Sequence, residues 1–229
     1  MWQYKKGDAP KNILDENIAY NLDNLTHIWK LSKTEKATLS KDGKITYKCA
    51  LCKNEKTKSI NKISNVSLSS VSYTYNGKEK KPSVTVKDSK GKTISKSNYS
   101  LSYSNNKKVG KASVKITFKG NYSGSKTLSF TINPAGTTLS KVTPAKKGFI
   151  AKWKKNTTQT TGYQIQYATN SKFTKNVKTV TVSKNTTASK KITKLKAKKK
   201  YYVRIRTYKT VSGKKYYSSW SKAKSVTTK

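Results

Sequence analysis

The stretch KLKAKKKYYVRIRTYKT, residues 194–210, decides how the chain is interpreted, because it combines dense positive charge with strict alternation. In its second half Tyr201, Val203 and Ile205 alternate with polar or charged positions. A period of two is typical of a β-strand with one buried face. We therefore predict a strand of a sandwich that carries its charge on the outside, rather than a basic arm that binds nucleic acid.

The charge of the whole chain is extreme. Its 229 residues include 51 Lys+Arg and 9 Asp+Glu, which give a net charge of +42. Arg204 and Arg206 are the only arginines. Lysine is a flexible, strongly hydrated point charge, whereas arginine supplies the bidentate contacts that recognise bases and phosphates. The lysine bias therefore predicts diffuse attraction to a polyanion rather than sequence readout.

Catalytic groups are scarce. No Asp or Glu follows Asp88, and His27 is the only histidine. Paired carboxylates for general acid–base work and a Ser-His-Asp triad are therefore excluded beyond Asp88. The acids before that point are too sparse for an active site, so the sequence predicts no enzyme.

Composition alone leaves the degree of order open. A hydrophobic content of 33% with this charge favours disorder, but 15 Tyr, 4 Trp and 4 Phe in alternating segments favour folded sheets. No apolar run reaches the length of a membrane span, and no signal peptide follows Met1. We expect two or three small domains, and an export signal outside this chain if the protein is secreted.

Short alternating segments recur after residue 69, separated by turn residues. VSYTYNG, residues 71–77, places Val71, Tyr73 and Tyr75 on one face and ends in an Asn-Gly turn. KASVKITFKG, residues 111–120, alternates apolar residues with lysine, serine and threonine. These patterns predict antiparallel sheets with one solvent-facing side.

A linker divides the strands into two groups. NPAGTT, residues 133–138, combines proline and glycine, which end a strand. Alternation resumes in GFIAKWKK, residues 148–155, where Phe149, Ala151 and Trp153 share a face. The predicted fold class is all-β, with tandem antiparallel sandwiches preceded by a small Cys-x-x-Cys hairpin module.

The second group resembles a fibronectin type III domain from residue 137 to the end. Trp153 stands where that family keeps a tryptophan on its second strand. Leu195, followed six residues later by Tyr201, matches the family's tyrosine corner. Trp220, in SSWSK, matches the Trp-Ser pair that opens the last strand. The absence of acidic residues departs from the family pattern.

The first group, residues 63–134, contains the motifs YNGK and, at 120–124, GNYSG. With these motifs it resembles small bacterial Ig-like modules. The tandem order is similar to the C-terminal region of secreted or cell-surface proteins of Gram-positive anaerobic bacteria. That resemblance implies an extracellular or cell-surface location and a spacing or adhesive role without catalysis.

The cysteines belong to a separate small module. Cys49 and Cys52 form Cys-x-x-Cys, and His27 lies upstream. The segment resembles short repeats with a His-x-Trp start and a final Cys-x-x-Cys, for which the resemblance implies a structural Cys₃His zinc site. Leu39 stands where the family has a further cysteine, so three ligands match.

Three alternatives remain open for this module. His27, Cys49 and Cys52 can hold a structural zinc ion with three protein ligands. Cys49 and Cys52 can instead pair as a disulfide or stay as free thiols, both of which an extracellular protein tolerates. A thioredoxin-like catalytic motif is disfavoured, because no βαβ pattern surrounds it. No other cofactor is expected.

The predicted domain plan has four parts: a linker or the end of an upstream element at 1–26, the His/Cys-x-x-Cys module at 27–62, the Ig-like sandwich at 63–134 and the fibronectin type III domain at 135–229.

The lysines admit two interpretations: a solvated surface that keeps the protein soluble, or electrostatic retention on an anionic cell-wall polymer or polysaccharide. For the second we select basic and aromatic residues of the final strands, with Tyr202 and Tyr208 expected to be exposed. The predicted anionic-ligand surface is Lys198, Lys199, Lys200, Tyr202, Arg204, Arg206, Tyr208, Lys214 and Lys215.

Two further functions compete with surface attachment. Non-specific nucleic-acid binding is favoured by charge and interleaved aromatics, but disfavoured by the near absence of arginine and of any recognised nucleic-acid-binding fold. The chain can also be a passive stalk of an upstream enzyme. A host or bacterial surface protein is a further possible partner, and we expect a monomer without a membrane span.

Overall fold

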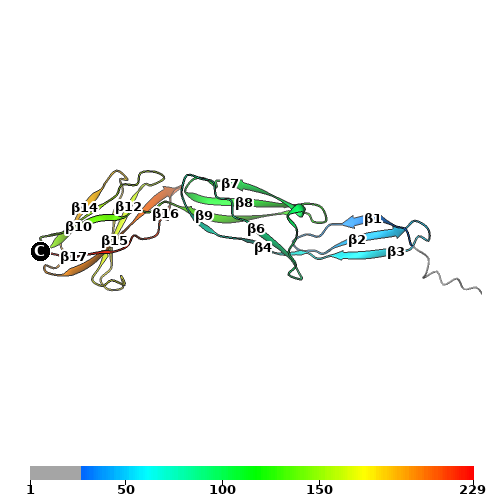
Figure 1. Ribbon diagram of the computed structural model, residues 1–229, viewed down its shortest axis with the longest axis horizontal. Coiled ribbons are helices and arrows are strands. Elements are labelled where there is room, and N and C mark those ends of the chain that lie inside the picture. The colour runs from blue at the N-terminus through cyan, green and yellow to red at the C-terminus, as the bar shows by residue number, and fades with distance from the viewer. Residues whose placement is uncertain (1–26) are drawn as a thin grey trace, which may run out of the picture.

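The computed structural model describes residues 27–229, which form an elongated row of three β units (Figure 1). The all-β fold predicted from the alternation is confirmed, because these residues form strands and one short 3₁₀ helix, Lys96–Asn98. The predicted linker or upstream element at 1–26 lies outside the described residues.

The first unit, which we call the N-terminal sheet, is a three-stranded antiparallel meander in a single layer. No hydrophobic cluster forms on it within residues 29–60. Leu31 and Leu51 are 64% and 68% exposed. Its strands are β1 Trp29–Glu35, β2 Gly43–Cys49 and β3 Glu55–Ile60.

The second unit, the middle sandwich, packs a two-stranded sheet, order β4-β6, against a four-stranded sheet, order β5-β9-β8-β7. All its pairings are antiparallel except the short parallel contact of β5 with β9. Its strands are β4 Ile63–Leu68, β5 Ser72–Thr74, β6 Val84–Asp88, β7 Tyr99–Ser104, β8 Gly110–Phe118 and β9 Ser125–Asn133.

Alternation builds the core of the middle sandwich. On β8, Val114 and Ile116 are fully buried, whereas the lysines between the apolar positions are exposed. Val86 of β6 packs against them from the facing sheet and is also fully buried. A strand whose apolar residues all point inward sends its polar residues into water, so this core forms without burying charge.

The third unit, the C-terminal sandwich, packs a sheet of order β10-β11-β14 against one of order β13-β12-β15-β16, in which β17 also pairs with β15. The strands are β10 Leu139–Ala145, β11 Gly148–Trp153, β12 Gly162–Ala168, β13 Lys178–Val182, β14 Ser189–Ile192, β15 Lys200–Val211, β16 Lys214–Tyr217 and β17 Lys224–Thr227.

Aromatic residues fill the core of the C-terminal sandwich. Trp153 lies 5.2 Å from Tyr163, between ring centroids, and Tyr167 makes an edge-on contact with Tyr201 at 6.0 Å. Leu195 packs at the margin of the same core. Aromatic side chains bury large areas, so this small sandwich excludes water with few residues.

Backbone hydrogen bonds join the N-terminal sheet to the middle sandwich. The N–H of Ala37 donates to the carbonyl of Asn121 at 2.9 Å, and its carbonyl accepts from Ser123 at 2.9 Å. The N–H of Ile63 donates to Thr38 at 2.9 Å. Ala37 is fully buried, so the two units meet through a small dry contact.

Asp88, the last acid of the chain, is buried at this junction. Its carboxylate accepts from the Asn61 side chain at 3.1 Å and from the backbone N–H groups of Lys90 and Lys92 at 2.9 Å each. The hydrogen bond from Asn61, followed by those two amides, lowers the pKa of the Asp88 carboxyl against the opposing effect of burial.

We predict that Asp88→Asn lowers the midpoint of thermal unfolding at pH 7, because the backbone N–H groups lose a charged acceptor and the new side-chain NH₂ faces the Asn61 donor. A depressed carboxyl pKa stabilises the fold above the unfolded value of about 4, and this contribution is lost as pH falls through the folded value. The difference between variant and wild type should therefore shrink below about pH 4.

Glu79→Gln is the control, since Glu79 is exposed and pairs only with Lys81 in the described structure. Calorimetry or circular dichroism measures both variants. Equal midpoints for Asp88→Asn and wild type at pH 7 would contradict this account of the junction.

Within residues 27–229 there is no helix with the length and apolar character that a membrane crossing requires.

Candidate functional site

Strand pairing brings His27 to the Cys-x-x-Cys turn. Cys49 ends β2 opposite Trp29, so the residue two positions before Trp29 reaches the turn. The Nδ1 atom of His27 lies 3.4 Å from Cys49 Sγ and 3.3 Å from Cys52 Sγ. The possible ligand atoms of these three residues all lie within 4.8 Å of one another. We call this group the His-Cys cluster.

The turn directs backbone N–H groups at one sulfur atom. The amides of Leu51 and Cys52 donate to Cys49 Sγ at 3.4 and 3.5 Å. The bond from Cys52, together with those from His27 and Leu51, lowers the pKa of the Cys49 thiol to about 6, although burial opposes the shift. Hydrogen bonds to a thiolate favour the charged form, which is the form that binds metal ions.

The surroundings orient the cluster and leave it partly open. The His27 ring packs against Trp29 with centroids 4.9 Å apart, and the Lys56 ammonium lies 4.3 Å from the Trp29 ring centroid. Cys49 is 1% exposed, whereas Cys52 faces the solvent. An ion held here would have protein on one side and water on the other.

Leu39 lies at the opposite end of the hairpin from the His-Cys cluster. It belongs to the loop that joins Glu35, the last residue of β1, to Gly43, the first of β2, whereas the cluster lies where Trp29 faces Cys49. The resemblance implied that a family cysteine is missing at this position. Because of its place in the hairpin, a residue at position 39 does not lie beside the cluster.

The predicted anionic-ligand surface is divided between the two ends of β15. Lys198 and Lys199 precede β15 and Lys200 begins it, whereas Lys214 and Lys215 begin β16 and pair with the last residues of β15. All five lysines are exposed. Eleven strand steps separate the ends by about 36 Å. The structure therefore does not gather these lysines into one patch.

Arg204 and Arg206 lie between those ends and use their guanidinium groups internally. The Nε and Nη2 atoms of Arg204 donate to Gln166 Oε1 at 2.8 and 2.5 Å. Those of Arg206 donate to Gln164 Oε1 at 2.9 and 2.7 Å. Both glutamines are cross-strand partners on β12, a pairing that sequence reasoning missed because it depends on register.

Aromatic rings cover both faces of each guanidinium group. Arg204 lies between Phe173 at 4.1 Å and Trp220 at 4.8 Å, and Arg206 lies between Trp220 at 4.3 Å and Tyr217 at 4.0 Å, measured to the ring centroids. Burial lowers the pKa of both guanidinium groups, which remain charged at neutral pH. We call these residues and their glutamine partners the arginine ladder. It uses two of the five N–H donors of each guanidinium group and fixes the plane of that group.

Tyr208 is not exposed, which corrects the prediction. It lies on the outer side of β15 but is only 3% exposed, because Gly162 stands opposite it and leaves room for the ring to lie flat. The Lys215 ammonium sits 5.1 Å from the ring centroid. Tyr202 is half-buried, with the Lys200 ammonium 5.5 Å from its ring centroid.

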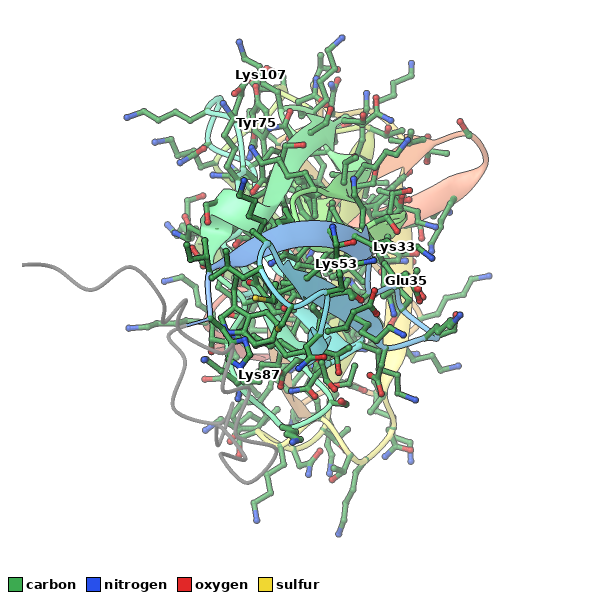
Figure 2. The ribbon with its side chains drawn as sticks, turned by 90° about the vertical axis from the view of Figure 1, so that its right-hand side faces the viewer. Lys33, Glu35, Lys53, Tyr75, Lys87 and Lys107 are labelled. Carbon is green, nitrogen blue, oxygen red and sulfur yellow. The ribbon has the colours of Figure 1, made fainter. Side chains whose placement is uncertain are left out.

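Lysine side chains surround the molecule on all sides. Figure 2 looks along the long axis and shows nitrogen-tipped side chains radiating outward, with Lys107 above and Lys87 below. Every lysine within residues 27–229 is exposed except Lys80 and Lys209, which are half-buried.

Carboxylates offset little of this charge. Over the same residues, two ion pairs form, one from Lys33 to Glu35 at 3.0 Å and one from Lys81 to Glu79 at 2.7 Å. The positive field is therefore a property of the whole surface rather than of one strand.

Comparison with known proteins identifies the family of the C-terminal sandwich. Residues 132–224 match the fibronectin type III domain. The buried Trp153 and Tyr201 of this fibronectin type III domain occupy its core, as their spacing in the sequence predicts. None of the curated proteins matches the chain.

Two solved structures show low overall similarity. A β-1,2-glucanase from Parabacteroides distasonis is 16% identical over 51% of this chain and 18% of its own, with a TM-score of 0.34. The chicken CNTN1 FN1–FN3 domains are 16% identical over 82% of this chain and 77% of their own, also with a TM-score of 0.34.

Proposed function

We propose that the chain is a non-catalytic extracellular module that attaches or spaces a larger protein at a cell surface. Its lysines hold it to anionic cell-envelope polymers such as teichoic acids or acidic polysaccharides. The fibronectin type III match supports this role, because that domain is generally a non-catalytic module and typically extracellular. The observation that carries the proposal is that all lysines of residues 27–229 reach solvent while no carboxylate follows Asp88.

The proposed mechanism is electrostatic. Ammonium groups that approach a polyanion release its condensed counterions, so affinity depends steeply on salt. The elongated row of units supports a spacing role as well, since it distributes the charge along a rod (Figure 1). A polymer lying beside this rod would meet lysines from all three units.

Nucleic-acid binding is the weaker alternative. Arginine is the residue that recognises phosphates and guanine bidentately. The arginine ladder holds Arg204 and Arg206, the only arginines of the chain, on glutamine and aromatic partners. With two arginines among 51 basic residues, nucleic acid would be bound mainly by lysine charge.

We predict that the protein binds teichoic-acid-containing bacterial cell walls at low salt. The affinity should fall by about 1,000-fold between about 50 and 200 mM NaCl, the loss expected when six or more anionic groups are contacted. Co-sedimentation with purified walls across a salt series measures this.

Lysine acetylation is the matched chemical control, because it removes the charge without shortening the chain. Acetylated protein should stay in the supernatant at every salt concentration, and neutral dextran should retain neither form. Salt-independent retention, or no retention at low salt, would refute electrostatic attachment.

We also propose that the His-Cys cluster holds a structural zinc ion. The N-terminal sheet has a single layer without a hydrophobic cluster, and units of this size generally need a metal or a disulfide to fold. Two thiolates and one imidazole suit Zn²⁺ and leave a fourth position open to water or an external ligand. The bound ion would cross-link the start of β1 to the turn between β2 and β3.

We predict that the reduced chain binds one Zn²⁺ in competition with a chromophoric chelator. Co²⁺ should give thiolate-to-metal absorption at the same site. Cys49→Ser and Cys52→Ser should each abolish binding, whereas Asp42→Asn, in the loop at the far end of the hairpin, should leave it unchanged.

Hydrogen exchange gives a second measurement that does not depend on metal absorption. Amides of β1–β3 should exchange faster when zinc is removed, while those of β8 stay protected. Two results together would contradict the zinc site: an intact mass two hydrogens lower than that of the reduced chain, and no metal uptake after reduction. They would mean that Cys49 and Cys52 form a disulfide.

A further inference from the structure

A large cleft lies between the middle sandwich and the C-terminal sandwich. One wall is the segment from Asn105 to Lys111, which comprises the β7–β8 loop and the start of β8, and the other is the β15–β16 hairpin around Ser212. Its volume is about 1010 Å³. Figure 1 shows β16 and β9 side by side at this junction. The cleft belongs to neither sandwich alone.

Direct contacts between the sandwiches form the base of the cleft. The N–H of Val109, itself 4% exposed, donates to Gln159 Oε1 at 3.3 Å. Gly110 is buried with φ of 145°, and a Cβ on it would lie 3.8 Å from Val211 Cγ1. The backbone of the middle sandwich therefore comes close to the C-terminal sandwich at this point.

Left-handed backbone positions shape the rim. Asn105, Gln159 and Ser212 have φ of 56°, 49° and 46°. Such angles are uncommon for residues other than glycine and persist only where the surrounding structure holds them. They place the turn at Asn105, the loop at Gln159 and the tip of the β15–β16 hairpin around the hollow.

The side chains around the cleft have one sign of charge. No acidic residue lines it, and amide, hydroxyl and tyrosine groups lie among its lysines. The lining lysines are Lys107, Lys108, Lys111, Lys209 and Lys214. Lysines facing one another across a hollow focus the positive potential there more than lysines on a convex surface do.

A second hollow extends the cleft along the middle sandwich. It has a volume of about 350 Å³ and reaches Val71 and Phe130. Lys111, Lys214 and Tyr216 line both hollows. The Lys214 ammonium lies 5.5 Å from the Tyr216 ring centroid. The two hollows therefore share part of their lining, and together we call them the basic groove.

We infer that this basic groove is a binding site for a segment of an acidic polysaccharide. Lysines would pair with its anionic groups, the amides of Asn106 and Gln159 and the Thr210 hydroxyl would bond its hydroxyl groups, and Tyr216 would border the path of the chain. A site that combines few convergent polar groups with apolar surface is the usual form of a ligand pocket. The inference rests on the proposed function and locates its binding site.

The lining favours sugar over nucleic acid. Single-stranded nucleic acid is bound by successive exposed aromatic platforms, and the groove offers one tyrosine edge that is 8% exposed. Hydroxyl-rich chains instead need side-chain donors and acceptors, which the amides and hydroxyls of the groove provide. The shared chemistry is a polyhydroxylated chain with carboxylate or phosphate groups.

The test compares two charge-matched variants of the full chain by fluorescence anisotropy with labelled oligogalacturonate. The groove variant neutralises lysines that line the groove: Lys108→Gln, Lys111→Gln and Lys214→Gln. The control variant neutralises exposed lysines of the C-terminal sandwich outside it: Lys190→Gln, Lys196→Gln and Lys224→Gln.

The groove variant should lose about tenfold or more in affinity and the control about threefold or less, because only the groove lysines form directed ion pairs. Circular dichroism melts should be equal for the two variants. Labelled poly(glycerol phosphate) in a parallel titration shows whether carboxylate or phosphate groups are preferred, and a neutral dextran oligomer should not bind.

Equal losses in the two variants would overturn the groove as a site and leave the diffuse electrostatic attachment intact. No binding of wild type to either acidic polymer at low salt would instead overturn the proposed function. A single-stranded oligonucleotide that binds more tightly than oligogalacturonate, with the same dependence on the groove lysines, would overturn the choice of ligand class.

Discussion

Mutual repulsion among the lysines is the constraint on which the structure depends. A net charge of +42 on 229 residues opposes any compact state, and carboxylates offset little of it. The sandwiches meet this constraint by separating charge from core along each strand. Val114 and Ile116 are fully buried while the lysines of the same strand are exposed. Hydrophobic burial therefore proceeds without bringing any ammonium group out of water.

In the arginine ladder, glutamine and aromatic side chains contact the two guanidinium groups that lie against the sheet of the C-terminal sandwich. Arg204 and Arg206 are cross-strand partners of Gln166 and Gln164, and Trp220 lies between the two guanidinium groups. Cation–π contacts contribute about 0.5–1 kcal/mol each at exposed sites. Planar arginine stacks between rings in a way that lysine does not. This accounts for arginine at these two positions in a chain that otherwise uses lysine.

Alternation was sufficient to predict the all-β fold and the inward faces of β11 and β15, because a period of two reports burial directly. Two predictions failed for local reasons. Val71 is 64% exposed although the pattern groups it with Tyr73 and Tyr75, because β5 begins only at Ser72. Tyr208 is buried because its cross-strand neighbour is Gly162, which depends on register and not on spacing.

Sites that depend on tertiary placement were only partly visible in the sequence. The His-Cys cluster could be anticipated from its residue types, whereas the contact of Nδ1 with both sulfur atoms requires the pairing of β1 with β2. The basic groove could not be predicted from the sequence, because Lys111 and Lys214 come from different sandwiches. The pattern of either segment only indicates a strand or a turn.

Apolar alternation holds the fold against the repulsion of its own surface, and this balance makes stability depend on salt. Screening shortens the range of the repulsion from about 30 Å at 0.01 M ionic strength to about 8 Å at 0.15 M. Thermal unfolding of the full chain should therefore shift to higher temperature as NaCl rises over this range. A midpoint that falls with added salt would mean that ion pairs, rather than the apolar cores, hold the protein together.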